Sequence, residues 1–266
     1  METRRLKNIV ILILVLLNLF LAALLLNFRF QGTRARRDML DELDALFSAN
    51  AISLSENLEL DVPQLPTLSV QRDLETEAEI AAMLLGEAVP AEYQGGGIYS
   101  YTGASGTVHF RSGGNFDYSP GTLHMEDPQA FCLDFCAAFG YEPTADLSED
   151  TGTFAAVQSL EGNAIYNCTV LFEFRSGDLV SLTGTYASTA STAVSQTSLT
   201  AVDALVQMLN YRNETGMVCN SIQRIVPVYE LQSGPSAALQ LAAKWQITAD
   251  AYEYYVDCST GDVVRA

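Results

Sequence analysis

The chain has 266 residues, with 14 basic against 32 acidic side chains and a formal net charge of −18. Seven of the basic residues lie at or before Arg37, so residues 38–266 hold seven basic and 31 acidic side chains, a net charge of −24. A region this acidic is repelled by nucleic acid and by anionic lipid headgroups, which excludes nucleic acid as a partner. Roughly 200 residues are enough to bury a core, as one domain or as a few small units.

The N-terminal region contains an apolar segment, Ile9 to Leu26, with Asn18 as its one polar residue. Its 18 residues span about 27 Å as a helix, close to the thickness of a bilayer's hydrocarbon core. The segment is longer than the apolar part of a signal peptide, and no small-residue cleavage site follows it. It predicts an uncleaved transmembrane helix over 9–28, preceded by a tail of residues 1–8.

Asn18 lies near the middle of this predicted helix. A lone amide at that depth hydrogen-bonds either across a helix interface or to its own helix, and both readings remain open. The charges that flank the segment are nearly balanced, with three basic side chains and the N-terminal amine before it and four arginines after it. The positive-inside rule alone therefore does not orient the helix.

Residues 29–62 are predicted to hold a juxtamembrane helix and a strand. Apolar side chains recur at helical spacing within 33–47, and acidic side chains lie between them. Residues 52–60 alternate roughly between apolar and polar, which favours a strand. Pro63 and Pro66 then mark a turn-rich connection.

The rest of the sequence reads as a helix followed by about three antiparallel strands, repeated as three units: 63–125, 126–190 and 191–266. The helices are predicted over Leu74–Leu85, from Asp127-Pro128 to Phe139, and over Leu199–Arg212. Strands are predicted over 97–102, 107–111, 115–118, 153–160, 164–175, 179–186, 221–231, 238–249, 252–257 and 262–265. Residues 188–198 are rich in Ser, Thr and Ala and indicate a linker. The predicted fold class is α+β, with a single N-terminal transmembrane helix followed by tandem helix-plus-antiparallel-sheet units.

Sequence patterns typical of enzymes are sparse. His109 and His124 fall in different predicted elements, and no HExxH, GxSxG or CxxC spacing occurs. Gly95-Gly96-Gly97 lacks the lysine of a phosphate loop and indicates a turn. Asp146 to Gly152 resembles half of a calcium loop, but its glycine is out of place, which favours a solvated turn. We expect no catalytic, cofactor-binding or metal site, and hence no enzyme.

Five cysteines match neither a disulfide framework nor a zinc spacing. Cys132 and Cys136 lie on one helix face and favour core packing, whereas a bridge from Cys168 to Cys219 or Cys258 remains open. Lys244 and Trp245 are adjacent in a predicted strand, so their side chains point to opposite faces. Two interpretations of this pair remain open: Trp245 packs in the core while Lys244 lies on the surface, or the pair contacts a partner protein. Asn167-Cys168-Thr169 and Asn213-Glu214-Thr215 match the glycosylation sequon, a pattern that often arises by chance.

Two stretches together resemble a known family. One is the basic start and apolar span from Lys7 to Leu21, and the other joins Ile225–Leu231 to the ending Tyr254–Val264. The ending, an aromatic and aliphatic strand followed by Asp, a small turn, Thr-Gly-Asp and aliphatic residues, is similar to that of PepSY-like domains. With the anchor, the chain resembles the YycH/YycI family, which regulates the YycG/YycF (WalK/WalR) two-component system of Gram-positive bacteria.

The resemblance implies a cytoplasmic N-terminus and a PepSY-like domain outside the cell membrane. It also implies that the chain modulates a sensor histidine kinase in cell-wall homeostasis, together with a YycH-like membrane protein. The residues expected to contact those partners are in the transmembrane helix: Leu17, Asn18, Phe20 and Leu21. The alternative function is a PepSY-type binding module that inhibits a protease or binds a ligand of the cell envelope.

Overall fold

The computed structural model describes residues 39–121, 124–148, 151–189, 191–196, 199–233 and 238–266. The chain divides into two compact units, one that ends at Ser55 and one that spans Glu56–Ala266. Among the described residues, no helix has both the length and the apolar character needed to cross a membrane. The predicted transmembrane helix 9–28, with its contact residues Leu17, Asn18, Phe20 and Leu21, lies outside them.

In the first unit, residues 39–49 are helical and the short strand β1 (Ser53–Leu54) follows. The buried apolar side chains here are Leu43, Phe47 and Ile52. The helix predicted over 33–47 is confirmed in its described part and continues two residues further. The strand predicted over 52–60 is wrong except for β1, because turns follow and break the alternation of apolar side chains.

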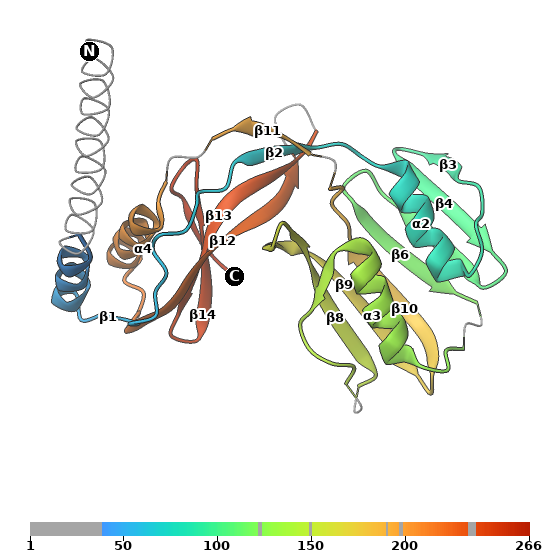
Figure 1. The fold of residues 1–266 in the computed structure, drawn as a ribbon, viewed down its shortest axis with the longest axis horizontal. Coiled ribbons are helices and arrows are strands. Elements are labelled where there is room, and N and C mark those ends of the chain that lie inside the picture. The colour runs from blue at the N-terminus through green and yellow to red at the C-terminus, as the bar shows by residue number, and fades with distance from the viewer. Residues whose placement is uncertain (1–38, 122–123, 149–150, 190, 197–198, 234–237) are drawn as a thin grey trace, which may run out of the picture. The chain divides into compact units, whose positions relative to one another are not determined.

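The second unit is built on one sheet, whose strands join in an order that differs from their order in the sequence. Its main strands are β2 (Thr67–Val70), β3 (Glu92–Gly95), β4 (Ile98–Gly103), β5 (Gly106–Phe110), β6 (Asn115–Pro120), β9 (Asn163–Arg175), β10 (Asp178–Thr185), β11 (Ser191–Ser195), β12 (Ser221–Ser233) and β13 (Leu239–Ala249). They follow the path β11-β2-β13-β12-β9-β10-β6-β5-β4-β3 (Figure 1). Beside this path lie β7 (Tyr141–Pro143), β8 (Thr153–Leu160), β14 (Tyr252–Asp257) and β15 (Val263–Arg265).

The predicted fold class of tandem antiparallel units is therefore wrong. The strands of the second unit form one mixed sheet. Two pairings overturn the separate units: β9 pairs with β12 in parallel, and β2 pairs with both β13 and β11. Apolar alternation identifies a strand but does not specify which distant strand it pairs with.

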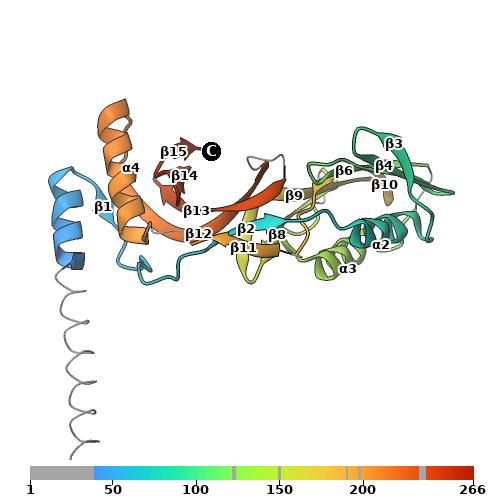
Figure 2. The same ribbon diagram turned by 90° about the horizontal axis from the view of Figure 1, so that it is seen from above.

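Helices α2 (Leu74–Leu85) and α3 (Pro128–Phe139) confirm their predicted ranges. Asp73 caps α2 by accepting hydrogen bonds from two backbone N–H groups, and Asp127 caps α3 from the residue before Pro128. Both helices lie on the same face of the sheet (Figures 1 and 2). Together with strands β4 to β6 and β8 to β10 they enclose one apolar core, in which Phe135 and Phe172 have their ring centroids 5.2 Å apart.

Two tight turns set the register of the neighbouring hairpins. Glu161 and Gly162, between β8 and β9, both have positive φ, as do Ser176 and Gly177, between β9 and β10. Two consecutive residues with positive φ are typical of the type I′ hairpin turn, whose twist matches that of the strands. The strands that the two turns join, β8 with β9 and β9 with β10, pair antiparallel.

The third helix, α4 (Ala201–Thr215), packs on β13, β14 and β15. It begins two residues after its predicted start, because Thr200 and Asp203 form a capping box at its N-terminus. Its buried face comprises Ala201, Ala204, Leu205, Met208 and Leu209. The linker predicted over 188–198 is wrong for Ser191–Ser195, which form β11.

Candidate functional site

Lys244 and Trp245 lie side by side in β13, and both are buried. Trp245 is 1% exposed, and its indole N–H donates to the Leu199 carbonyl oxygen at 3.0 Å. Lys244 is 8% exposed, so the expected surface lysine is wrong. Because successive side chains alternate across a strand, Lys244 is on the sheet face opposite to Trp245.

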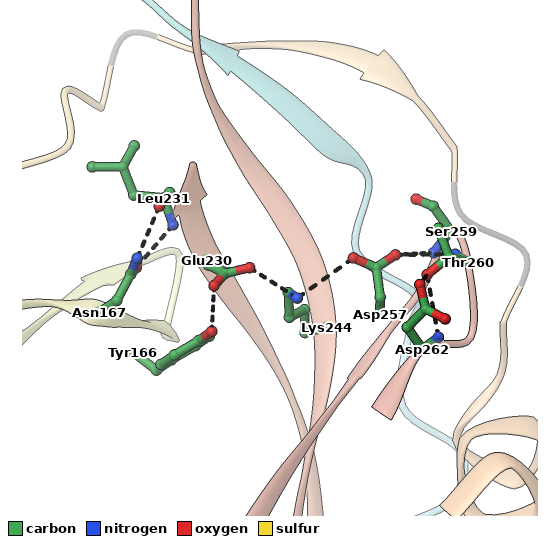
Figure 3. Close-up of polar contacts among 9 residues, drawn as sticks. All are labelled: Tyr166, Asn167, Glu230, Leu231, Lys244, Asp257, Ser259, Thr260 and Asp262. Carbon is green, nitrogen blue, oxygen red and sulfur yellow. Dashed lines mark hydrogen bonds and ion pairs between the residues drawn. The ribbon is translucent and has the colours of Figure 1, made fainter. Parts of the chain in front are cut away.

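Two carboxylates neutralise the buried ammonium group. Lys244 Nζ is 2.8 Å from Glu230 Oε2 of β12 and 3.5 Å from Asp257 Oδ2 of β14 (Figure 3). Asp257 lies directly opposite Lys244 in the β13–β14 ladder, which places its carboxylate within reach. A buried ammonium is tolerated only when it is paired, and here three adjacent strands supply the group and its partners.

Tyr166 of β9 extends this group across the sheet. Its hydroxyl donates to Glu230 Oε1 at 2.6 Å (Figure 3). Its ring stacks on that of Tyr255, with the centroids 3.9 Å apart. Burial and the hydrogen bond to Glu230 raise the pKa of Tyr166, and burial raises the pKa of Tyr255 to about 12. Both phenols are therefore neutral at pH 7. We call Tyr166, Glu230, Lys244 and Asp257 the charged cluster; it has one cation and two carboxylates.

The turn after β14 is held by the same Asp257. Its Oδ1 accepts hydrogen bonds from the backbone N–H groups of Ser259 at 2.8 Å and Thr260 at 3.0 Å, while Oδ2 faces Lys244 (Figure 3). Thr260 in turn donates its hydroxyl to Asp262 Oδ2 at 2.7 Å. The Asp, small turn and Thr-Gly-Asp that carried the sequence resemblance thus form a side-chain-stabilised turn that positions one member of the charged cluster.

A second contact attaches β9 to β12 next to the cluster. The Asn167 side chain donates to the Leu231 carbonyl oxygen and accepts from the Leu231 N–H, both at 2.8 Å (Figure 3). The backbone register of the two strands includes a single pair, Ile165 with Tyr229. The side-chain amide of Asn167, the acceptor residue of the first glycosylation sequon, therefore has a structural role: it makes two backbone hydrogen bonds.

A groove of about 680 Å³ adjoins the charged cluster. Val226 lies opposite Gln246 and Val228 opposite Lys244, so these two lining valines are on the same face of β12 and β13 as the cluster. The groove is lined by Asn57, Glu59, Val62, Glu142, Gly162, Asn163, Ala164, Gln223, Arg224, Ile225, Val226, Pro227, Val228 and Gln246. The lining combines aliphatic residues, which we call the floor, with polar residues, which we call the rim. Such a mixed lining suits binding of an extended ligand. We take the groove and the charged cluster as the candidate functional site.

The two histidines are apart from the groove. His109 Nδ1 is 3.4 Å from Asp117 Oδ2, on strands β5 and β6, and Arg111 also contacts Asp117. His124 is 2.8 Å from Asp178 in an exposed pair. Neither histidine lines the groove, and the structure does not bring the two together.

The five cysteines are all free and buried, so the disulfides left open from the sequence are not formed. Burial raises the pKa of Cys132, Cys168 and Cys258 to about 12 and that of Cys136 to about 11. These thiols stay protonated at pH 7 and pack as small apolar side chains. Within the described residues there is no group of three metal-ligating side chains; Asp146 to Gly152 is described only in part.

Sequence reasoning missed Tyr166, Glu230 and the whole groove. Tyr166 and Glu230 are 64 residues apart, so no local pattern joins them. One signal was present: Lys244 is the one charged residue of the predicted strand 238–249, which is mostly apolar. A charged side chain in such a position calls for a partner.

No protein-family model matches the chain, and no curated protein matches it. Two solved structures are similar to part of this chain. A protein described as uncharacterized from Eubacterium rectale is 9% identical, with a TM-score of 0.45, over 81% of this chain and 86% of its own. The Bacillus megaterium YpeB C-terminal domain is 11% identical, with a TM-score of 0.34, and the match covers 74% of this chain and 98% of that domain. Nothing in these comparisons is specific to YycI-type proteins or to two-component systems.

Proposed function

We propose that the chain is a non-catalytic binding module, without a cofactor, whose groove recognises a partner. The observation that supports this function is the groove of about 680 Å³, lined by aliphatic and polar residues, beside a charged cluster whose one cation is already paired with two carboxylates. Ligand sites are typically concave and lined by apolar groups with a few polar ones. An extended polypeptide segment suits such a groove.

We further propose that the module acts as an extracytoplasmic regulator of a sensor histidine kinase in cell-wall homeostasis. Support comes from the sequence: the apolar segment Ile9–Leu26 and the resemblance to the YycH/YycI family. In this arrangement the chain crosses the cell membrane once, with its N-terminus in the cytoplasm. The helix contacts the kinase and a YycH-like protein through Leu17, Asn18, Phe20 and Leu21.

The test is co-purification of the full-length chain with the sensor kinase from membranes. Asn18→Leu removes the one polar side chain of the apolar segment, and we expect it to reduce the recovered kinase several-fold. Leu12→Ile, an apolar exchange in the same segment, is the matched control. Kinase recovery that is equal for both variants, or kinase output that is unchanged when the protein is deleted, contradicts this role.

A second candidate function uses the same groove without the kinase. Here the module inhibits a protease or binds a ligand of the cell envelope. The two functions differ in which residue matters: protease inhibition or ligand binding depends on groove residues such as Glu142 and is insensitive to Asn18→Leu.

A further inference from the structure

The polar rim of the groove has more carboxylates than cations. Glu59 and Glu142 line it with Arg224, and all three side chains are exposed. None of the three forms an ion pair with another residue in the described part of the chain. The adjoining cluster adds one cation and two carboxylates. Both parts of the site therefore carry a net negative charge, in a region whose net charge is −24 over residues 38–266.

The amides of the rim add hydrogen-bond acceptors. Asn163, Gln223 and Gln246 each use the NH2 group to donate to a protein oxygen: Glu161 O at 3.3 Å, Asp250 O at 3.1 Å and Tyr255 OH at 3.5 Å. Their carbonyl oxygens have no partner among the described residues and are left as acceptors. A groove rich in acceptors favours a ligand that brings donors.

The floor contributes an apolar surface but an incomplete strand edge. Val226 and Pro227 are partly exposed in the groove, and Val228 is buried. Pro227 has no backbone N–H, so β12 lacks one donor at this position. A ligand that added as a regular strand would miss that hydrogen bond, which makes side chains the principal means of recognition.

We propose that the groove binds an extended polypeptide segment that carries lysine or arginine, with the cationic side chain held by Glu59 and Glu142. Adjacent side chains of an extended segment point to opposite sides, so with the cationic side chain at the rim its apolar neighbour is directed to Val226 and Pro227. This inference rests on the proposed binding function and specifies the partner's chemistry. The acidic character of the region steers such a basic segment toward the groove.

The test uses the full-length chain in an uncharged detergent and three blocked, fluorescent peptides of alternating valine with lysine, glutamate or glutamine. Fluorescence anisotropy measures the dissociation constants at low and high salt. We expect the lysine peptide to bind about tenfold more tightly than the glutamine peptide, with the glutamate peptide weakest, and the difference to shrink at high salt.

Variants of the rim locate the effect. The double variant Glu59→Gln with Glu142→Gln should remove most of the preference for lysine, and Arg224→Gln should strengthen lysine-peptide binding severalfold. Glu126→Gln, an exposed carboxylate that does not line the groove, is the control for net charge. Equal binding of the lysine and glutamate peptides, or equal effects of the double variant and Glu126→Gln, overturns the inference.

The outcome also separates this inference from the proposed function. If the kinase co-purifies with the chain but the peptides show no charge preference, the basic-segment proposal fails and the regulatory role stands. If the lysine peptide binds through Glu59 and Glu142 but no kinase is recovered, the basic-segment proposal stands and the kinase role fails.

Discussion

Asn167 holds both backbone groups of Leu231 with a single side-chain amide, through two hydrogen bonds of 2.8 Å. In a parallel sheet, backbone groups normally make these bonds. Here the register between β9 and β12 includes one residue pair, and a side chain continues the ladder beyond it. Part of the attachment between the two strands therefore depends on the identity of residue 167.

Replacing Asn167 by Ala should lower the free energy of unfolding by about 1–3 kcal/mol, because the N–H and C=O of Leu231 lose their partner. Asn167→Asp should also destabilise, since a carboxylate accepts from the N–H but cannot donate to the carbonyl oxygen. Denaturant unfolding of the full-length chain measures both. Asn213→Ala, at an exposed amide in α4, is the control, and unfolding energies equal to the wild type for both Asn167 variants refute the prediction.

Lys244→Met should destabilise the protein by about 2–3 kcal/mol, because Glu230 and Asp257 keep buried charge without their cation. The value is lower than for a fully buried pair because the two carboxylate side chains are 24% and 18% exposed. Adding Glu230→Gln and Asp257→Asn to this variant should restore part of the loss.

Arg175→Met removes an exposed cation and should change the free energy of unfolding little. Thermal and denaturant unfolding of these variants test the charged cluster. A Lys244→Met protein as stable as the Arg175→Met protein contradicts the assignment of a buried ion pair.

The acid sensitivity of the protein should depend in part on Asp250. Hydrogen bonds from Asn220 and Ser221 hold the pKa of this carboxyl below its usual 3.8. A lowered pKa in the folded state stabilises the fold above pH 3.8, and this stabilisation is lost as pH falls through the lower value. Asp250→Asn should therefore lower stability at pH 7 and flatten its dependence on pH below about pH 4.

Unfolding curves recorded at several pH values measure this change. Asp134→Asn, at an exposed position of α3, is the control and should keep the wild-type dependence. The prediction fails if both variants follow the same curve.

The five cysteines should be slow to react in the folded protein. A thiol with a pKa of about 12, as for Cys132, is thiolate in about one molecule in ten thousand at pH 8, and it is also buried. Labelling with a maleimide at pH 8 should be slow in buffer and rapid and complete in denaturant. Rapid labelling of the native chain would show that the cysteines are accessible.

Local signals were enough to predict the helices α2 and α3. The ends of both helices could be predicted because caps act on neighbouring backbone groups: Asp73 and Asp127 precede α2 and α3, and a glycine follows each helix. β2 and β11 could not be predicted in this way. Ser191–Ser195 has the composition of a linker, and it is a strand because it pairs with Thr67–Val70, a partner far away in the sequence.

The candidate site was predicted only in fragments. The sequence predicts Lys244 as a surface lysine and Asp257 as part of a turn, and it does not connect them. Lys244 contacts Asp257 because β13 pairs with β14, and it contacts Glu230 because β12 pairs with β13. The groove depends on segments from 57 to 246 and has no signature in any one of them.

The pairing of β2 with β13 has a kinetic consequence. Leu68 of β2 pairs with Leu241 of β13. The hydrogen bonds between β2 and β13 therefore cannot form until the C-terminal part of the chain has been synthesised. During synthesis, β2 leaves the ribosome long before its partner exists and cannot take its final place. Such long sequence separation slows folding and prolongs the time in which strand edges are exposed to aggregation.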